Sequence, residues 1–403
     1  MWGKANLTII VYFISLCLLI LITPPYGDPA VVLWTSKIMS ITGFPYDPIC
    51  SISKTVNGVN LQFCVRSPLY YMLLGFSGDY YKIFLIILVG LYFILQTSLT
   101  HSIGSSSTVY ALMFPPIYLL FSRTYVDTLT AILSTTLLAT WIKARTGNDR
   151  YYKILLFSAP LLLMLTRESS TALPFLLLII FLMERNFKDK TLLIVFLGWA
   201  AGFSIYHLYI TLSGGAYYSD FQPHIPSSEE VYRAFMTAST PILPWEISRQ
   251  DLQTYLHLPE YVDWFTPAII IVVHLLAVMV LVPLILSLTH IKDLHRVIIG
   301  WLIFGSLILI GLLFLKGDID FFRHLSYLLP VIPLLIEKGL TEVKKYSRVG
   351  VGLIKTSYIL LFALYLVRAI RLYTSGYAFD PCQYLLNRPE ISSIDFFYKT
   401  ACS

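Results

Sequence analysis

The feature that most constrains this chain is a series of long apolar runs that recurs along most of its length. A helix needs about 20 apolar residues to cross the hydrocarbon core of a bilayer. About eleven stretches approach that length, at 7–23, 82–102, 106–122, 128–143, 153–166, 171–184, 191–212, 266–289, 297–315, 325–341 and 352–373. Only 13% of the 403 residues are charged, whereas a soluble domain carries about 25%. The pattern predicts an all-α integral membrane protein with about 11 transmembrane helices.

The short loops between these runs differ in their content of basic residues. The loops rich in Lys and Arg are 143–153, 185–190, 290–296 and 338–348. The intervening loops, such as 123–127, hold one or two basic residues each. Because cytoplasmic loops collect Lys and Arg, this distribution predicts a cytoplasmic N-terminus and an outer C-terminus. The net charge of +6 is explained by these loops, and we expect no nucleic-acid partner.

The remaining polar stretches all fall on the outer face in this topology. Residues 1–373 are expected to form one polytopic transmembrane domain, with outer loops at 24–81 and 213–265. Residues 374–403 are expected to form a short outer tail. The short loops favour a prokaryotic plasma membrane as the location of the protein.

Four of the five cysteines lie in these outer stretches: Cys50, Cys64, Cys382 and Cys402. An even number of thiols in an oxidising compartment favours disulfides. Local pairing, Cys50 with Cys64 and Cys382 with Cys402, is the simplest of the three connectivities. Free buried thiols are the alternative.

Acidic and basic side chains gather at the outer ends of the predicted helices. The members of these clusters are Asp28, Arg123, Asp127, Arg167, Glu168, Asp318, Asp320, Arg323 and His324. Charged groups at membrane helices are costly and therefore mark functional sites more often than loop charges do. A single arginine can also snorkel to lipid headgroups, and Asp127 can cap the following helix. Clustering on one face favours the functional interpretation.

Several segments stand in the order of the motifs of one enzyme family. They are Gly27-Asp28-Pro29, the Arg66-Ser-Pro-Leu-Tyr-Tyr segment, Ser-Arg-Thr-Tyr-Val-Asp127, Leu-Thr-Arg167-Glu168 and Arg323-His324-Leu-Ser-Tyr327-Leu-Leu-Pro330. These segments resemble the type-C glycosyltransferases, polytopic enzymes that include protein mannosyltransferases and lipid A aminoarabinose transferases. The resemblance covers roughly residues 1–185 and 318–341. The chain departs from the family in its lone Asp28, where many members have two adjacent acids, and in its short outer tail.

The resemblance implies a GT-C-like fold and transfer of a sugar on the outer face. The donor would be a polyprenyl-phosphate-linked sugar, and the acceptor a protein, a lipid or a glycan. The implied catalytic carboxylates are Asp28, as general base, and Asp127. The implied phosphate-binding residues are Arg66, Arg123, Arg167 and Arg323. The implied supporting residues are Glu168, Asp318, Asp320, His324 and Tyr327. Metal dependence stays open, and Asp28 and Asp127 are the candidate ligands for a divalent cation.

Three other classes of membrane protein compete with this interpretation. One is a non-enzymatic structural or assembly protein, which would leave the Asp and Arg clusters on one face unexplained. A transporter or flippase of lipid-linked glycans would carry charged or broken helices near the bilayer midplane, where this sequence has few charges. A glycan polymerase or ligase would use similar lipid carriers and outer arginines. No P-loop, dinucleotide-binding fingerprint or His-Glu-x-x-His zinc motif is present in the sequence.

Overall fold

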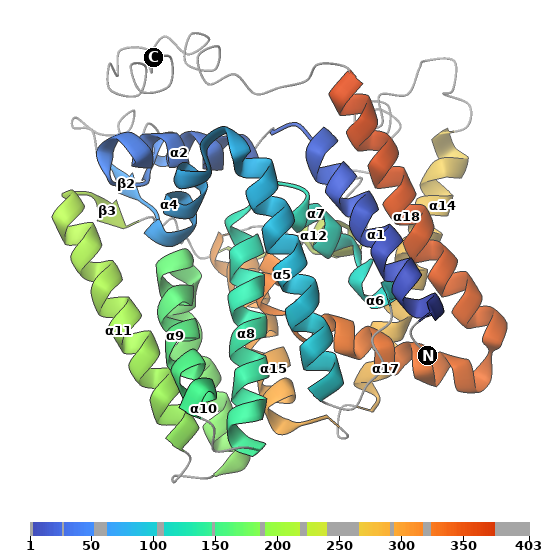
Figure 1. The fold of residues 1–403 in the computed structure, drawn as a ribbon. Helices are drawn as coiled ribbons and strands as arrows, with labels where there is room; N and C mark the ends of the chain where they lie inside the picture. The colour runs from blue at the N-terminus through green and yellow to red at the C-terminus, as the bar shows by residue number, and fades with distance from the viewer. Residues whose placement is uncertain are drawn as a thin grey trace.

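The computed structural model describes residues 3–25, 28–51, 63–102, 109–146, 150–185, 190–217, 224–239, 266–290, 294–316 and 324–374. Nearly all of the described chain is helical (Figure 1). The helices are α1 (Gly3–Ile22), α2 (Asp28–Thr42), α4 (Pro68–Ser77), α5 (Tyr81–Ser102), α6 (Val109–Leu112), α7 (Pro115–Phe121), α8 (Val126–Thr146), α9 (Arg150–Thr166), α10 (Leu173–Glu184), α11 (Lys190–Ser213), α12 (Ser228–Ser239), α14 (Thr266–Leu288), α15 (Arg296–Lys316), α17 (Ile332–Tyr346) and α18 (Arg348–Thr374). Short 3₁₀ helices are η1 (Gly78–Tyr80), η2 (Glu168–Ala172) and η5 (Leu325–Tyr327).

Five helical segments among the described residues are long and apolar enough to cross a membrane. They are Pro68–His101, Lys190–Ser213, Pro267–Leu288, Arg296–Phe314 and Arg348–Thr374. A sixth is counted if α7 and most of α8, which are bent by 119° at their junction, form one span. The apolar part of α1, Thr8–Ile22, is shorter. The chain is therefore an all-α multi-pass membrane protein, and the predicted count of eleven spans is not confirmed.

Two of the predicted spans differ from the observed helices. The run 106–122 contains the short helices α6 and α7, because two prolines in succession, Pro115 and Pro116, start a new helix rather than continue one. The run 325–341 contains η5 and the start of α17. Figure 1 shows α17 lying across the bundle axis. This helix carries charged residues such as Glu337 and Lys345, so its composition does not suit a lipid-facing span.

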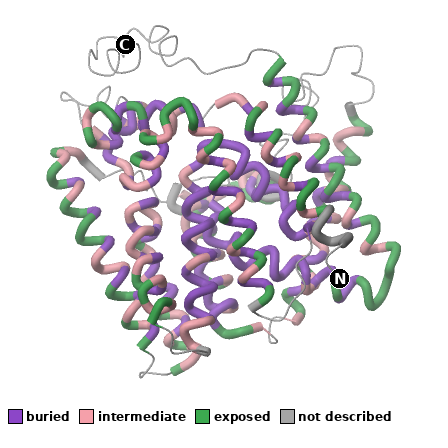
Figure 2. Tube along the Cα trace, viewed as in Figure 1, coloured by how far each residue is buried: buried purple, intermediate pink, exposed green. Residues whose placement is uncertain are grey.

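Helix α8 forms the centre of the bundle. Figure 2 shows it buried along its length, whereas α1, α11 and α18 each expose part of their surface. The buried positions of α8 include several hydroxyl groups, of which Thr135 and Thr140 donate to carbonyl oxygens one turn earlier. These bonds satisfy polar groups inside an apolar core, which would otherwise be costly to bury.

Helices α9 and α11 pack closely because α11 presents glycines to α9. A Cβ atom on Gly198 would overlap the carbonyl oxygen of Phe157, and one on Gly202 would lie 2.7 Å from the carbonyl oxygen of Leu161. Gly198-Trp-Ala-Ala-Gly202 is the small-xxx-small pattern that lets membrane helices approach one another. This close contact holds α11 beside α9, the helix that ends directly before Arg167.

A small cap covers one end of the bundle. Figure 1 shows α2 and a three-stranded sheet at the end where α1 and α18 finish. The sheet consists of β1 (Tyr46–Asp47), β2 (Cys64–Val65) and β3 (Ala216–Tyr217); β1 pairs antiparallel with β2, and β2 pairs parallel with β3. The cap has its own apolar cluster, formed by Trp34, Ile38, Tyr46, Val65, Met164, Tyr206 and Ile210. It falls within the segments predicted as outer loops.

The predicted disulfide between Cys50 and Cys64 is confirmed, and it closes the loop between β1 and β2. Cys382 and Cys402, which were predicted to form a second pair, lie outside the described residues. Cys17 in α1 is a free thiol.

Candidate functional site

Asp127 occupies the first turn of α8, directly after the turn that follows α7. The residue is only 4% exposed. The hydroxyl of Ser326, which precedes Tyr327 in η5, donates to Asp127 Oδ1 at 3.1 Å. The bend between α7 and α8 therefore places a buried carboxylate against a segment about 200 residues away in the sequence.

Arg167 pairs with Asp127. It lies between α9 and η2 in an extended conformation, and its Nη1 forms an ion pair with Asp127 Oδ1. Its Nη2 donates to Nδ1 of His324 at 2.7 Å. The ion pair joins two of the acid/base clusters predicted from the sequence, the one that contains Asp127 and the one that contains Arg167. The hydrogen bond to His324 adds the cluster that contains this histidine. The three side chains form one buried hydrogen-bonded group that we call the Asp127–Arg167–His324 cluster.

Glu168 links this cluster to the cap. Its Oε1 accepts the backbone N–H of Ser67 at 2.7 Å. Arg66, the neighbour of Ser67, donates from Nε to Asp47 Oδ2 at 2.8 Å, and its Nη2 lies 2.7 Å from the same oxygen. Asp47 Oδ1 in turn accepts the N–H of Cys50 at 2.9 Å. In the described part of the chain, Arg66 therefore pairs with an acidic residue of the cap, and its neighbour Ser67 connects it to Glu168.

Tyr327 connects η5 to the segment that carries Arg167. Its hydroxyl hydrogen-bonds with Ser169 Oγ (2.9 Å) and Ser170 Oγ (2.8 Å), both in η2. Its carbonyl oxygen accepts from Trp301 Nε1 of α15 at 2.5 Å. Tyr327 is buried. These bonds hold η5, and with it His324 and Ser326, against the turn that carries Arg167.

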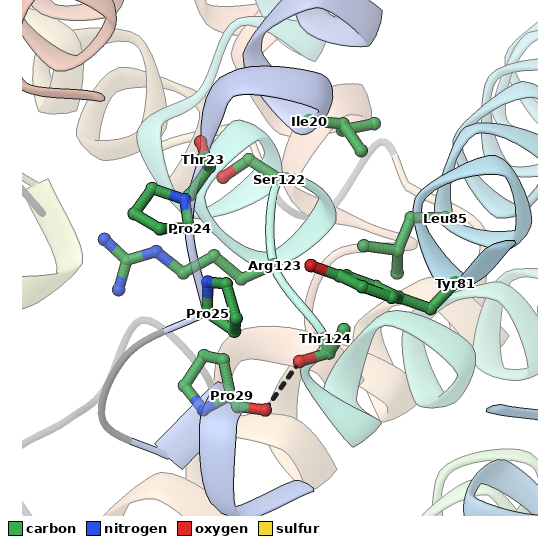
Figure 3. Close-up of a pocket in the computed structure, with 10 residues that line it drawn as sticks. All are labelled: Ile20, Thr23, Pro24, Pro25, Pro29, Tyr81, Leu85, Ser122, Arg123 and Thr124. Carbon is green, nitrogen blue, oxygen red and sulfur yellow. Dashed lines mark hydrogen bonds between the residues drawn. The ribbon is translucent and has the colours of Figure 1, made fainter. Parts of the chain in front are cut away.

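Asp28 begins α2 and is exposed. The residue after it, Pro29, accepts a 2.8 Å hydrogen bond at its carbonyl oxygen from Thr124 Oγ1 (Figure 3). Thr124 lies three residues before Asp127 in the same turn. The start of α2 is therefore tied to the turn that positions Asp127, although the two carboxylates come from different segments.

A pocket adjoins this turn, and it is shown in Figure 3. Its cavity volume is about 10 Å³, which is room for about one water molecule, so it is a shallow recess in this structure. The lining residues are Ile20, Thr23, Pro24, Pro25, Pro29, Tyr81, Leu85, Ser122, Arg123 and Thr124. Arg123 contributes a charged side chain to a lining that is otherwise apolar or neutral, so the pocket combines one cation with hydroxyl groups.

Arg123 is held by α18. Its Nε donates to the hydroxyl of Tyr365 at 3.1 Å, and its guanidinium carbon lies 5.8 Å from the centre of the Tyr365 ring. The Tyr365 hydroxyl also hydrogen-bonds with Ser122 Oγ at 3.3 Å. Arg368 lies one turn further along the buried face of α18 and is itself buried. Arg368 and Tyr365 therefore share one side of α18, because residues three apart on a helix are neighbours.

Sequence analysis missed Asp47 and Arg368. A signal for Arg368 was present, since it is a charged residue inside a predicted membrane-spanning run. Asp47 had no comparable signal, because it lies in a loop where charged residues are ordinary. Its importance depends on its burial within the cap.

Three predicted site residues, Asp318, Asp320 and Arg323, lie outside the described residues. Within the part of the chain that the structure describes, no group of three or more His, Cys, Asp or Glu side chains is placed to hold a metal ion. Asp127, one of the two candidate ligands, has the guanidinium of Arg167 as its counter-charge. For this reason, no metal ion is assigned a role in the chemistry of this site.

A second group of titratable side chains lies at the opposite end of the bundle. Arg145, near the end of α8, donates to Glu184 Oε1 at 2.5 Å. His295 precedes α15 beside this pair. Burial lowers the pKa of His295 below its usual value, the charge of Arg145 lowers it further, and Glu184 opposes the shift.

We predict that His295 makes the protein less stable in mild acid. Because the folded state binds the proton more weakly than the unfolded state, the free energy of unfolding is highest above pH 6.5 and falls as the pH drops through the histidine range. Thermal unfolding of wild type and His295→Gln between pH 5 and pH 8 tests this, since glutamine does not titrate. The wild type is expected to lose more stability than the variant on acidification. Equal pH profiles would contradict the prediction.

Comparison of the chain with protein-family models, with curated proteins and with solved structures finds no match in any of the three.

Proposed function

We propose that this chain is a membrane glycosyltransferase that moves a sugar from a polyprenyl-phosphate-linked donor to an acceptor. The observation that carries the proposal is the connection of distant acid/base segments into one network. Hydrogen bonds and one ion pair join Pro29 to Thr124, Asp127 to Arg167 and Ser326, and Glu168 to Ser67. A pocket containing Arg123 lies beside it. Such a site offers a carboxylate for a hydroxyl proton and a guanidinium for a phosphate.

The residue roles follow from the partners that each side chain already has. Asp127 Oδ1 accepts from Arg167 and Ser326, so this carboxylate serves to position Arg167 rather than to take a proton. Asp28 is exposed and begins a helix, which suits a general base that must meet an acceptor from solvent. Arg123 lines the pocket and is assigned to the donor phosphate.

The proposed reaction is a single displacement. The acceptor hydroxyl oxygen attacks the anomeric carbon of the donor sugar, and its proton passes to the carboxylate of Asp28. The bond between that carbon and the donor phosphate oxygen breaks, and the phosphate leaves with the electron pair. Arg123 offsets the negative charge that develops on the phosphate.

The proposal includes a GT-C-like arrangement of membrane helices, in which shorter helices such as α9 and α10 also span the membrane. The N-terminus is assigned to the cytoplasm, and the capped end and the C-terminus to the outer face of a prokaryotic plasma membrane. The disulfide between Cys50 and Cys64 in the cap supports this assignment, because disulfides persist in oxidising compartments.

Sugar transfer by the purified protein in lipid nanodiscs tests the function. The protein is offered a panel of radiolabelled polyprenyl-phosphate sugars, with membrane extract as acceptor. Asp28→Asn is expected to lower transfer by about 100-fold or more, because general base catalysis is lost. Asp79→Asn is the matched control, since Asp79 is also an exposed aspartate in the first turn of a short helix, and it is expected to leave transfer unchanged.

The variant Arg123→Gln is measured in the same sugar-transfer assay. It is expected to weaken donor binding, because glutamine keeps hydrogen-bonding groups but removes the charge. If the wild type neither binds nor turns over any donor of the panel, the glycosyltransferase proposal is overturned. Translocation of a lipid-linked glycan is then measured in vesicles that contain the same protein.

A further inference from the structure

The corner where α17 ends and α18 begins carries an excess of positive charge. Together, α17 and the first eight residues of α18 contain five basic and two acidic residues. Both oxygens of Glu342 lie 2.7 Å from Nζ of Lys345, and Lys338 donates to the carbonyl oxygen of His290. The second acid, Glu337, is buried. The basic residues of this corner that pair with no carboxylate in the described part of the chain are Lys344, Arg348 and Lys355.

Lys355 is a charged residue inside a helix that is apolar enough to span a membrane. Its Nζ lies 4.7 Å from the centre of the Tyr110 ring on α6. An aromatic ring attracts a cation, but it does not neutralise the charge. A charge inside a spanning helix is costly without a counter-charge. An anion that reaches Lys355 would therefore be bound favourably.

Arg348 and Lys355 lie on the same side of α18, because residues seven apart are separated by about two helical turns. Gly352 lies between them on that side. It is exposed, and an added Cβ atom would meet nothing within 4 Å. Side chains on a helix lean toward its N-terminus, so Lys355 extends back toward Arg348 and the polar boundary of the membrane. The two cations thus border an open strip of the helix surface.

The surroundings of this strip suit the boundary between lipid headgroups and acyl chains. The spanning helix starts at Arg348, and the adjacent Tyr346 and Val349 are 85% and 74% exposed. Tyrosine is enriched at membrane–water interfaces. One turn beyond Lys355, Ile359 exposes an apolar side chain. Basic residues at the start of the strip and apolar residues along it match a phosphate followed by a hydrocarbon chain.

We propose that the corner between α17 and α18 is a binding site for an anionic phospholipid. Arg348 and Lys355 hold its phosphate, and Lys344 adds positive charge from the end of α17. The open surface at Gly352 admits the lipid, and an acyl chain follows α18 past Ile359. This site goes beyond the proposed function, because α18 runs from this corner to the capped end of the bundle (Figure 1) and the site needs no sugar donor.

Native mass spectrometry of the purified protein tests the lipid preference. The protein is held in detergent micelles that contain equal amounts of phosphatidylglycerol and phosphatidylcholine. We expect the wild type to retain phosphatidylglycerol about tenfold more often than phosphatidylcholine, because each basic side chain near an anionic headgroup favours it severalfold. Arg348→Gln/Lys355→Gln is expected to reduce this preference to about twofold or less. Equal retention of both lipids by the wild type, or an unchanged preference in the variant, overturns the proposal.

Two further variants separate a bound lipid from other effects of the substitutions. Arg348→Lys/Lys355→Arg keeps both charges and is expected to keep the preference; its loss there would show that the charges are not the cause. Lys37→Gln/Arg371→Gln removes two exposed basic residues at the capped end and changes the net charge equally. It is expected to retain phosphatidylglycerol as the wild type does. An equal loss of preference in this control would reveal diffuse attraction to the net charge and would overturn the site.

Discussion

Replacement of Arg167 by methionine is expected to destabilise the protein by about 3–5 kcal/mol. The side chain of Arg167 is 14% exposed and that of Asp127 is 6% exposed. Methionine fills similar space but leaves the Asp127 carboxylate buried without its counter-charge. Removing one partner of a buried ion pair is costly for this reason, even where the intact pair adds little net stability. Unfolding of the detergent-solubilised protein in an SDS titration measures the effect.

Two controls show whether the loss arises from the unpaired charge. Asp127→Asn/Arg167→Met leaves no charge at either position and is expected to recover most of the lost free energy of unfolding. Arg233→Met breaks the pair with Glu229 on α12, whose partner carboxylate is 63% exposed, and is expected to cost at most about 1 kcal/mol. If Arg167→Met were as stable as the wild type, Asp127 would have another counter-charge.

Alanine at Gly198 or Gly339 is expected to cost about 1–3 kcal/mol or more. A Cβ at Gly198 would overlap the carbonyl oxygen of Phe157 on α9, and a Cβ at Gly339 would overlap the carbonyl oxygen of Pro283 on α14. Both obstacles are backbone atoms, so one helix must move away from the other. That movement opens the close contact on which association of membrane helices depends.

Gly311 and Gly352 provide matched controls for this prediction. Both lie inside membrane-spanning helices, α15 and α18, and an added Cβ meets nothing within 4 Å at either position. Alanine there is expected to be neutral or to stabilise by up to about 1 kcal/mol, because alanine is the better helix former. The same SDS titration compares the four variants. Equal effects at all four positions would show that helix propensity, rather than helix contact, decides the outcome.

Several features followed from the sequence because they depend on neighbours along the chain. Apolar runs long enough to span a bilayer identified the helices that carry the fold, and the ends of α11, α14, α15 and α18 lie within four residues of the predicted ranges. The pairing of Cys50 with Cys64 followed from their short separation. Where local composition conflicted with a continuous helix, as at Pro115 and Pro116, the predicted span was wrong.

The partners of the charged residues were decided only by the tertiary structure. Arg66 and Arg167 were both assigned to a phosphate, yet Arg66 pairs with Asp47 in the cap, and Arg167 lies between Asp127 and His324. The sequence spacing between these partners ranges from 19 to 157 residues. The partners of Arg167 depend on the bend between α7 and α8 and on how η5 docks against η2. The pair of Arg66 with Asp47 depends on the pairing of β1 with β2.

The sequence by itself determined that this protein is built from membrane helices and that clusters of acidic and basic residues lie at several helix ends. Hydropathy is a sum over neighbouring residues, and the cost of burying charge in lipid acts on each residue alone. The tertiary structure decided which of those charges neutralise one another and which line a pocket. It also decided where glycine is required, since the distance between two helix backbones is set by the packing of both helices.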